Sequence, residues 1–368
     1  MSEQPTPDRP EGWGTAMQAS VCERCDWLYL VPASRPLANC PHCGAATPAA
    51  LSEELEALPT VRPPEFAIPF ALTPEALSRG VEAFAADIPF PPPGLNAEAL
   101  QSRLRPIYLP TWLVDADVEA LWEAEVGFNY QVVSHEEHYD DRRHGWVTRE
   151  VEEGRIRWEP RVGQLHRTYH NVPAPALEEH AALRERLGEW DLADLEPYRP
   201  SHVTDAAVAL PDRTPEGAWP AALPTVRRRA AEECQEAADA DHLRQFRWRP
   251  EFLSRDWTLL LRPVYATTYE DDKGHPRVLL IHGRTGRVDG ARRASMARAQ
   301  PRALIIGALA LVMFVASLAF AAAGLLVPPL LIVGGLGGLA ALLTGAGALV
   351  PIARVWQFNR QQDAAEGS

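Results

Sequence analysis

The stretch CERCDWLYLVPASRPLANCPHC, residues 22–43, holds two C-x-x-C pairs with fourteen residues between them: Cys22, Cys25, Cys40 and Cys43. Two thiolates on each of two tight turns can close a tetrahedron around a metal ion. A strand-like run at Trp27–Val31 lies between the pairs. The pattern predicts a zinc ribbon over residues 17–50 with one structural Zn²⁺, since four protein ligands leave no open position for catalysis. Disulfides, an accidental pattern, or iron in the same four-thiolate geometry are the alternatives.

The first thirteen residues are polar and proline-rich, with no basic region followed by an apolar one. This composition is unlike a secretory signal peptide, so we expect the body of the protein in the cytoplasm. Thiols stay reduced there, and paired C-x-x-C units hold metal more often than they form disulfides. The expected compartment therefore favours the metal over the disulfides.

Two uncharged apolar runs, Ala303–Leu326 and Leu330–Ile352, each exceed the roughly 20 residues that a membrane-spanning helix needs. Arginines flank the pair on both outer sides, and the turn between the runs has no charge. This distribution predicts a two-span protein of the cytoplasmic (inner) membrane, with the body and both termini in the cytoplasm.

The surroundings of the apolar runs suggest two kinds of contact. Gly334, Gly338 and Gly345 allow close helix packing within the pair of spans or between subunits, so a homo-oligomer is one expectation. The basic residues at 291–302 are expected to attract anionic membrane lipid. Neither run contains an ionisable residue, which argues against an ion or proton path.

The remaining sequence predicts an α+β fold with antiparallel β-hairpins. Capping residues and periodicity predict helices over 73–86 and 96–104, capped by Thr73 and Asn96, and over 175–190 and 225–246. Alternating apolar residues at 114–126 predict a half-buried strand, and a second strand at 277–282 ends in the hairpin turn of Gly283-Arg284-Thr285-Gly286.

The order of these segments divides the chain. We expect a disordered lead (1–16), the zinc ribbon (17–50), a linker with an acidic helical patch at 51–58 (51–64), the α+β body (65–290), a basic juxtamembrane segment (291–302), the two spans (303–326 and 330–352) and a cytoplasmic tail (353–368). The segment 104–112 reappears in altered form as 261–269, an offset of 157 residues, which suggests an internal pseudo-repeat.

Charge and composition exclude several functions. The net charge of −13 disfavours broad nucleic-acid binding. Lys273, the only lysine, does not follow the spacing of a phosphate-binding loop, which also argues against a helicase. Four histidines invite a second metal site or, alternatively, belong to a solvated polar hairpin: His135, His138, His166 and His170. Cys234 lies beside two glutamates in a predicted helix and is expected to be unreactive.

The chain resembles a group of uncharacterised bacterial membrane-anchored zinc-ribbon proteins. The resemblance rests on the four cysteines, Phe66–Phe70, Tyr108–Ala116, Arg262–Tyr265, Gly283–Gly290 and the double apolar helix. His282 departs from it, because an asparagine is expected there, and Thr111 stands where a second aromatic residue is usual. The group has no established activity that the resemblance could imply.

These observations favour a non-enzymatic, membrane-anchored adaptor that binds another protein on the cytoplasmic face. The alternative is a membrane-tethered nucleic-acid-binding protein that uses the ribbon, and an enzyme built on the histidines is a third possibility. No catalytic residue is predicted. In the adaptor hypothesis, Cys40→Ser should release the metal and unfold residues 17–50 while the later body stays folded.

Overall fold

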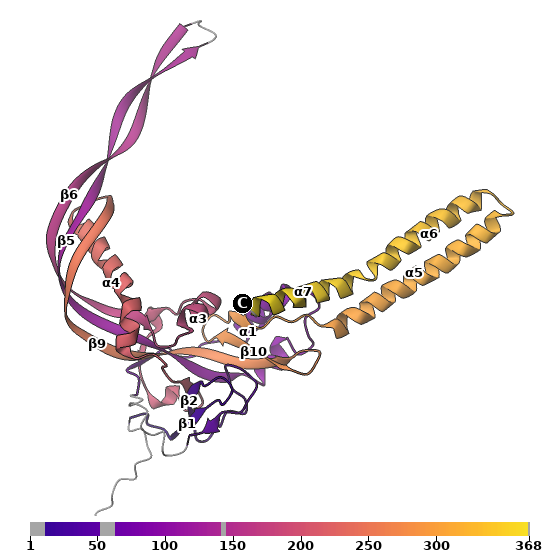
Figure 1. The fold of residues 1–368 in the computed structure, drawn as a ribbon, viewed down its shortest axis with the longest axis horizontal. Helices are drawn as coiled ribbons and strands as arrows, with labels where there is room; N and C mark the ends of the chain where they lie inside the picture. The colour runs from indigo at the N-terminus through magenta and orange to yellow at the C-terminus, as the bar shows by residue number, and fades with distance from the viewer. Residues whose placement is uncertain (1–11, 52–62, 141–144, 367–368) are drawn as a thin grey trace, which may run out of the picture. The chain divides into compact units, whose positions relative to one another are not determined.

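A computed structural model describes residues 12–51, 63–140 and 145–366. The predicted α+β class is confirmed, with the cysteine cluster near the start and two apolar helices near the end (Figure 1). The first eleven residues of the predicted lead and nearly all of the helical patch at 51–58 lie outside the described residues.

The strands form one eleven-stranded sheet. Its main path runs in the order β11 (Val288–Gly290), β10 (Pro276–His282), β9 (His242–Glu270), β5 (Arg105–Asp140), β8 (Ala207–Ala209), β2 (Leu28–Pro32), β1 (Met17–Val21) and β3 (Ala49–Ala50). Off this path, β6 (Gly145–Pro175) pairs with β5, and β4 (Phe66–Ala67) pairs with β9 and with β7 (Glu196–Pro197). The ribbon strands join the rest of the sheet because β2 pairs with β8 through Tyr29 and Leu30.

The chain separates into two compact units. The first comprises residues 1–110, 181–210 and 261–368, and the second comprises 111–180 and 211–260. Strands β5 and β9 each contribute residues to both units. The finer division of the chain that the sequence suggests stays a prediction.

The predicted helix caps at Thr73 and Asn96 are confirmed. Helix α1 (Pro74–Ala86) begins where the Thr73 hydroxyl accepts a hydrogen bond from the Ala76 amide, and α2 (Ala97–Gln101) begins at the Asn96 cap. The predicted helix over 175–190 is wrong in extent: α3 spans only His180–Leu187, because residues up to Pro175 continue strand β6. Two 3-10 helices follow, η2 (Leu192–Asp194) and η3 (Pro200–His202).

The predicted helix over 225–246 is also wrong in position. Helix α4 spans Pro215–Ala237, and residues from His242 onward form β9. The missed signal is Thr214-Pro215-Glu216, which repeats the capping pattern of α1: the Thr214 hydroxyl accepts from the Gly217 amide. Pro220 and Pro224 lie inside the helix. Because proline ordinarily breaks a helix, these two residues argue against a helix that begins at Pro215.

The predicted turn after β10 is confirmed, and His282 organises it. The ring nitrogen Nδ1 of His282 accepts hydrogen bonds from the amides of Arg284 and Thr285, both at 3.2 Å. The proton therefore belongs on Nε2, which lies 3.3 Å from the Glu189 carbonyl oxygen. An asparagine could supply the same acceptor, which explains why histidine can stand at this position.

We expect His282 to make stability depend on pH. Burial, with a smaller contribution from Arg262 and Arg284, lowers the pKa of His282 below its ordinary value of 6.5. Below about pH 6.5 the unfolded chain binds a proton that the folded protein does not, so stability falls by up to about 1.4 kcal/mol per pH unit. His282→Asn should remove this contribution. Urea unfolding of the parent protein and of His282→Asn between pH 7.5 and 5 gives the free energy of unfolding of each. If the two free energies changed with pH in the same way, the expectation would be contradicted.

The two copies of the pseudo-repeat lie in adjacent strands, β5 and β9. Tyr108 and Tyr265 occupy equivalent positions in the two copies. Their rings both contact the Phe70 ring, with centroids 4.9 Å and 4.7 Å away. The equivalent tyrosines therefore share one aromatic cluster in the first unit.

In the second unit, β5 and β6 form a long twisted ribbon beside α4 (Figure 1). The predicted strand at 114–126 is confirmed and extends much further, since β5 pairs with β6 from Thr111 to Asp140. Even-numbered β5 residues from Val114 to Ala124 pack against small residues of α4 such as Ala222 and Val226. We call this the inner face of the ribbon and the opposite one the outer face.

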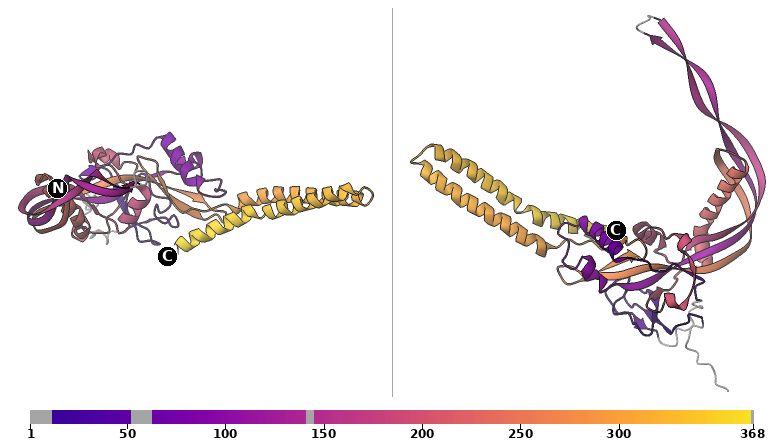
Figure 2. Two further views of the ribbon diagram at one scale, coloured as in Figure 1. Left: turned by 90° about the horizontal axis from the view of Figure 1, so that it is seen from above. Right: turned by 180° about the vertical axis from the view of Figure 1, so that it is seen from behind.

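The apolar C-terminal segment forms helices α5 (Met296–Gly324) and α6 (Pro329–Gly347), which lie side by side (Figure 2). Helix α5 and the run Pro329–Ala364, which contains α6 and most of α7, are each long and apolar enough to cross a membrane. A Cβ atom at Gly334 would lie 2.7 Å from the Ala321 backbone nitrogen, whereas one at Gly335 would meet no atom within 4 Å. The predicted close helix contact through Gly334 therefore occurs within the pair.

The tail is a helix docked on the first unit. Helix α7 (Val350–Glu366) buries Val355 in the core formed by α1, α2 and β10. The side chain of Asn359 hydrogen-bonds both the amide and the carbonyl oxygen of Ala294, and Arg293 forms an ion pair with Asp363. The segments before α5 and after α6 are thus tied to each other.

Candidate metal centre

The four predicted cysteine ligands converge. Their Sγ atoms all lie within 4.8 Å of one another, and the Cys22–Cys43 and Cys25–Cys40 pairs are both 3.6 Å apart. A disulfide requires about 2.05 Å, so the disulfide alternative does not fit these positions. A tetrahedron with metal–sulfur bonds of about 2.3 Å puts sulfurs roughly 3.8 Å apart, close to the observed spacing.

Two turns of the same shape position the sulfurs. After each C-x-x-C pair the next residue donates its amide back to the first cysteine carbonyl: Asp26 to Cys22 at 2.8 Å and Gly44 to Cys40 at 2.9 Å. Both residues adopt left-handed backbone conformations, with φ of 59° and 68°. This conformation favours glycine and tolerates aspartate, so the sequence after each pair suits its turn.

Amides inside the turns point at the sulfurs. The Arg24 and Cys25 amides face Cys22, and the Cys43 and His42 amides face Cys40. Burial raises the pKa values of Cys25 and Cys40. Burial also acts to raise the pKa of Cys22, but hydrogen bonds from these amides and from the Cys25 and Cys43 side chains outweigh it and lower this pKa to about 7. A metal ion must therefore displace protons from the thiols, and its affinity should fall at low pH.

Neighbouring side chains fix the cluster. The Tyr29 hydroxyl lies 3.4 Å from Cys40 Sγ. The His42 ring stacks on Trp27 at 4.2 Å and is outside the ligand group, so the cysteines alone converge. Gly44 packs against β10, since a Cβ atom there would lie 2.6 Å from a Val278 methyl carbon. The donor set fits a four-thiolate metal site, whose metal the geometry alone does not identify.

The predicted histidines do not gather into a second site. His135 and His138 lie three residues apart on β5 and therefore point to opposite faces. His166 and His170 share a face, but four strand residues span about 13 Å. Each pairs locally instead, His166 with Asp117 and His170 with Asp115. Within 12–51, 63–140 and 145–366, the four cysteines are the only group of three or more potential ligands.

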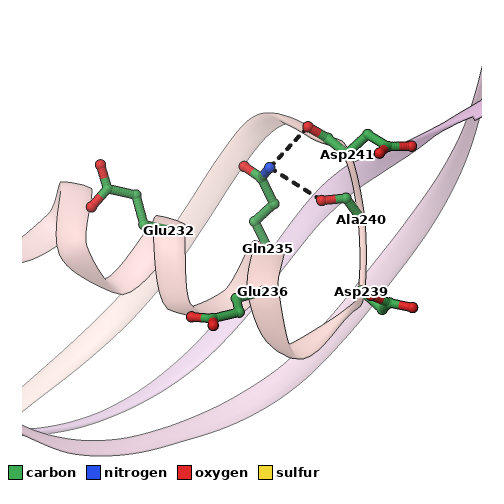
Figure 3. A pocket seen from close by; sticks show the side chains of 6 residues that line it. All are labelled: Glu232, Gln235, Glu236, Asp239, Ala240 and Asp241. Atoms are coloured by element: carbon green, nitrogen blue, oxygen red, sulfur yellow. Dashed lines mark hydrogen bonds between the residues drawn. The ribbon is translucent and has the colours of Figure 1, made fainter.

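A cavity of about 380 Å³ at the end of α4 has an acidic lining but carries no site. Gln235 donates from Nε2 to the carbonyl oxygens of Ala240 and Asp241, at 3.2 and 3.0 Å, and so closes the turn into β9. The carboxylates of Glu232, Glu236 and Asp239 point away from one another (Figure 3). They hold no common position for a cation.

Cys234 behaves as the sequence suggests. It is buried in α4, and burial together with Glu233 raises its pKa to about 11. A thiol that stays protonated at neutral pH is a poor nucleophile. Cys234 therefore serves as an apolar residue of the inner-face core.

Comparison with known proteins adds no identification. No family model, no curated protein and no solved structure matches this chain. The coarser resemblance, a cysteine cluster that can hold a metal followed by two apolar helices, is present, and the specific family stays a prediction.

Proposed function

We propose that this protein is a non-enzymatic, membrane-anchored zinc-ribbon adaptor that binds a partner protein along the outer face of the β5–β6 ribbon. The observation that carries the proposal is a row of exposed apolar side chains on that face. Alternation along the strands and the β5–β6 register place these residues on the same face of the twisted ribbon: Leu121, Val133, Tyr139, Trp146, Ile156 and Val162. Trp146 is 72% exposed and Val162 79%.

The charges that the two ribbon strands themselves place around this row are negative. By the same alternation, the outer face carries carboxylates and no arginine or lysine from either ribbon strand: Asp117, Glu119, Glu123, Glu125, Glu137, Glu150 and Glu152. Arg244 and Arg247 of β9 pair with two of them, Glu125 and Glu123. An apolar row flanked by carboxylates suits a partner with apolar and basic side chains.

The same distribution weakens the nucleic-acid alternative. An acidic outer face repels phosphate. On the inner face, arginines pair with neighbouring carboxylates, as Arg155 does with Glu153 and Arg161 with Glu159. Filter binding across salt concentrations would still distinguish the two functions, since phosphate contacts produce a steep salt dependence.

Two further features support the cytoplasmic, membrane-anchored part of the proposal. The Asn359–Ala294 hydrogen bonds join the segments before α5 and after α6, which supports a hairpin with both ends on the same side of a membrane. Arginines lie at both ends, which favours the cytoplasmic side. Zn²⁺ is the ion we assign to the cysteines, because four-thiolate tetrahedral sites in proteins hold zinc or iron and an isolated structural ion is commonly zinc.

Site-specific photo-crosslinking in native membranes tests the proposal. A photoreactive residue at Val133, 55% exposed on the outer face, should give one reproducible adduct with a second protein. The matched control is Tyr130, which is 45% exposed on the same strand and points to the inner face. It should give no such adduct.

The adduct at Val133 should also weaken when Leu121→Asp and Val162→Asp are introduced together, because both extend the apolar row. Equal adducts from both positions, or none from Val133, would reject the outer face as the binding surface. An adduct at twice the mass of this chain would assign the contact to a second copy instead.

A further inference from the structure

In the described part of the chain, one edge of strand β6 has no neighbouring strand along much of its length. Among the described residues, β6 pairs with β5 alone. Near its base α4 covers this edge, where Arg229 donates to the His170 carbonyl oxygen at 2.9 Å. Toward the tip, residues 145–163 have β5 on one side only. An isolated two-stranded ribbon is marginally stable in water, and an open edge is a template for another strand.

We propose that two copies of this chain pair antiparallel through β6, about a two-fold axis at Gly154. In a symmetric antiparallel pair, one residue must face its own counterpart, and every residue then faces the one equally distant on the other side. With Gly154 on the axis, the paired stretch runs from Gly145 to Gly163.

The charges along β6 match this register. Arg149 faces Glu159 of the second copy, and Glu153 faces Arg155 of the second copy, each twice by symmetry. No like-charged pair occurs between Gly145 and Gly163. Charged side chains usually blunt a sheet edge, but here their order makes the edge complementary to itself.

A shift of one residue destroys the match. With Glu153 on the axis, Glu153 faces itself and Arg149 faces Arg157. With Arg155 on the axis, Arg155 faces itself and Arg149 faces Arg161. Like charges directly opposite each other destabilise a strand pair, so neighbouring registers are disfavoured.

The apolar residues support the same register. Trp146 and Val162, the two most exposed apolar side chains of the ribbon, face each other across the copies. Both lie on the outer face, whereas the charged pairs lie on the inner face. Gly154 leaves the axis unobstructed, since a Cβ atom there would meet nothing within 4 Å.

Charge reversal and mixing test this pairing in the full-length protein in mild detergent. Glu153→Arg alone and Arg155→Glu alone each set like charges opposite at two symmetry-related positions. Each should raise the dimer dissociation constant by about tenfold or more, measured by sedimentation equilibrium. An equimolar mixture of the two variants, carrying different affinity tags, should form a heterodimer of nearly wild-type affinity because opposite charges face each other again.

The mixture separates contacts between chains from those within one. Glu153 and Arg155 also pair along their own strand at 3.0 Å, and that pair stays broken in both variants. Glu152→Arg is the control, since it makes the same charge change opposite Ile156 and should leave dimerisation unchanged. A monomeric wild-type protein, or a dimer that survives both reversals because the apolar helices hold it, would overturn the proposal.

Discussion

Cys40→Ser should release the bound ion and unfold the ribbon. Cys40 is 1% exposed and its Sγ lies within 4.8 Å of the other three sulfurs, so its loss leaves an incomplete ligand set in the core. Structural zinc contributes about 10–16 kcal/mol to the folding of small zinc modules, more than most domains have in total. Metal analysis of the purified variant should find the ion absent or greatly reduced.

The damage should spread further than the sequence suggests. Strand β2 pairs with β8, and Leu30 packs in one core with Tyr108, Val208 and Leu261. Hydrogen exchange should therefore rise in β8 as well as in residues 17–50. Cys234→Ser is the control, because Cys234 is buried in α4 and is not a ligand; it should keep the ion. A full complement of metal in Cys40→Ser would reject the four-thiolate site.

Gly80→Ala should destabilise the first unit strongly. The turn after β10 packs backbone-to-backbone on α1: a Cβ atom at Gly80 would lie 1.7 Å from the Gly286 carbonyl oxygen. Replacing glycine by alanine inside a helix ordinarily raises the free energy of unfolding by about 1 kcal/mol. Here, however, the new methyl group would force α1 and the turn apart. We expect a net loss of about 1–3 kcal/mol or more in the free energy of unfolding. Denaturant unfolding measures it.

Gly94→Ala is the matched control for this change. A Cβ atom at Gly94 would have only the flexible end of Arg103 nearby, at 3.8 Å. It should leave the unfolding midpoint nearly unchanged. If Gly80→Ala were as stable as the parent protein, the tight packing of the turn on α1 would be wrong.

Local signals in the sequence were sufficient for several elements. The spacing of the cysteines, the caps at Thr73 and Asn96, the alternation at 114–126 and the apolar runs each specify structure through neighbouring residues. The Thr214 cap is an equally local signal for the start of α4. It was missed because two prolines follow within the helix. These features could be predicted because the physical cause lies within a few residues of the effect.

Other features depend on contacts between distant segments. The 353–368 segment is polar, and only the packing of Val355 and the hydrogen bonds of Asn359 with Ala294 reveal a docked helix. The length of the β5–β6 ribbon depends on the register of two strands whose outer parts are mostly charged, and charged segments lack a clear strand signal. The exposed outer face of the ribbon therefore could not be predicted from the sequence.

The clamp between Asn359 and Ala294 has a mechanical consequence. A transmembrane helix attached by one flexible end can lean as lipid thickness changes without disturbing what it carries. Here the segments before α5 and after α6 are joined to each other by the Asn359–Ala294 hydrogen bonds, and the Arg293–Asp363 ion pair reinforces the joint. In a membrane, a change in lipid thickness that tilts the helix pair would therefore also tilt the part of the first unit to which both of its ends are joined.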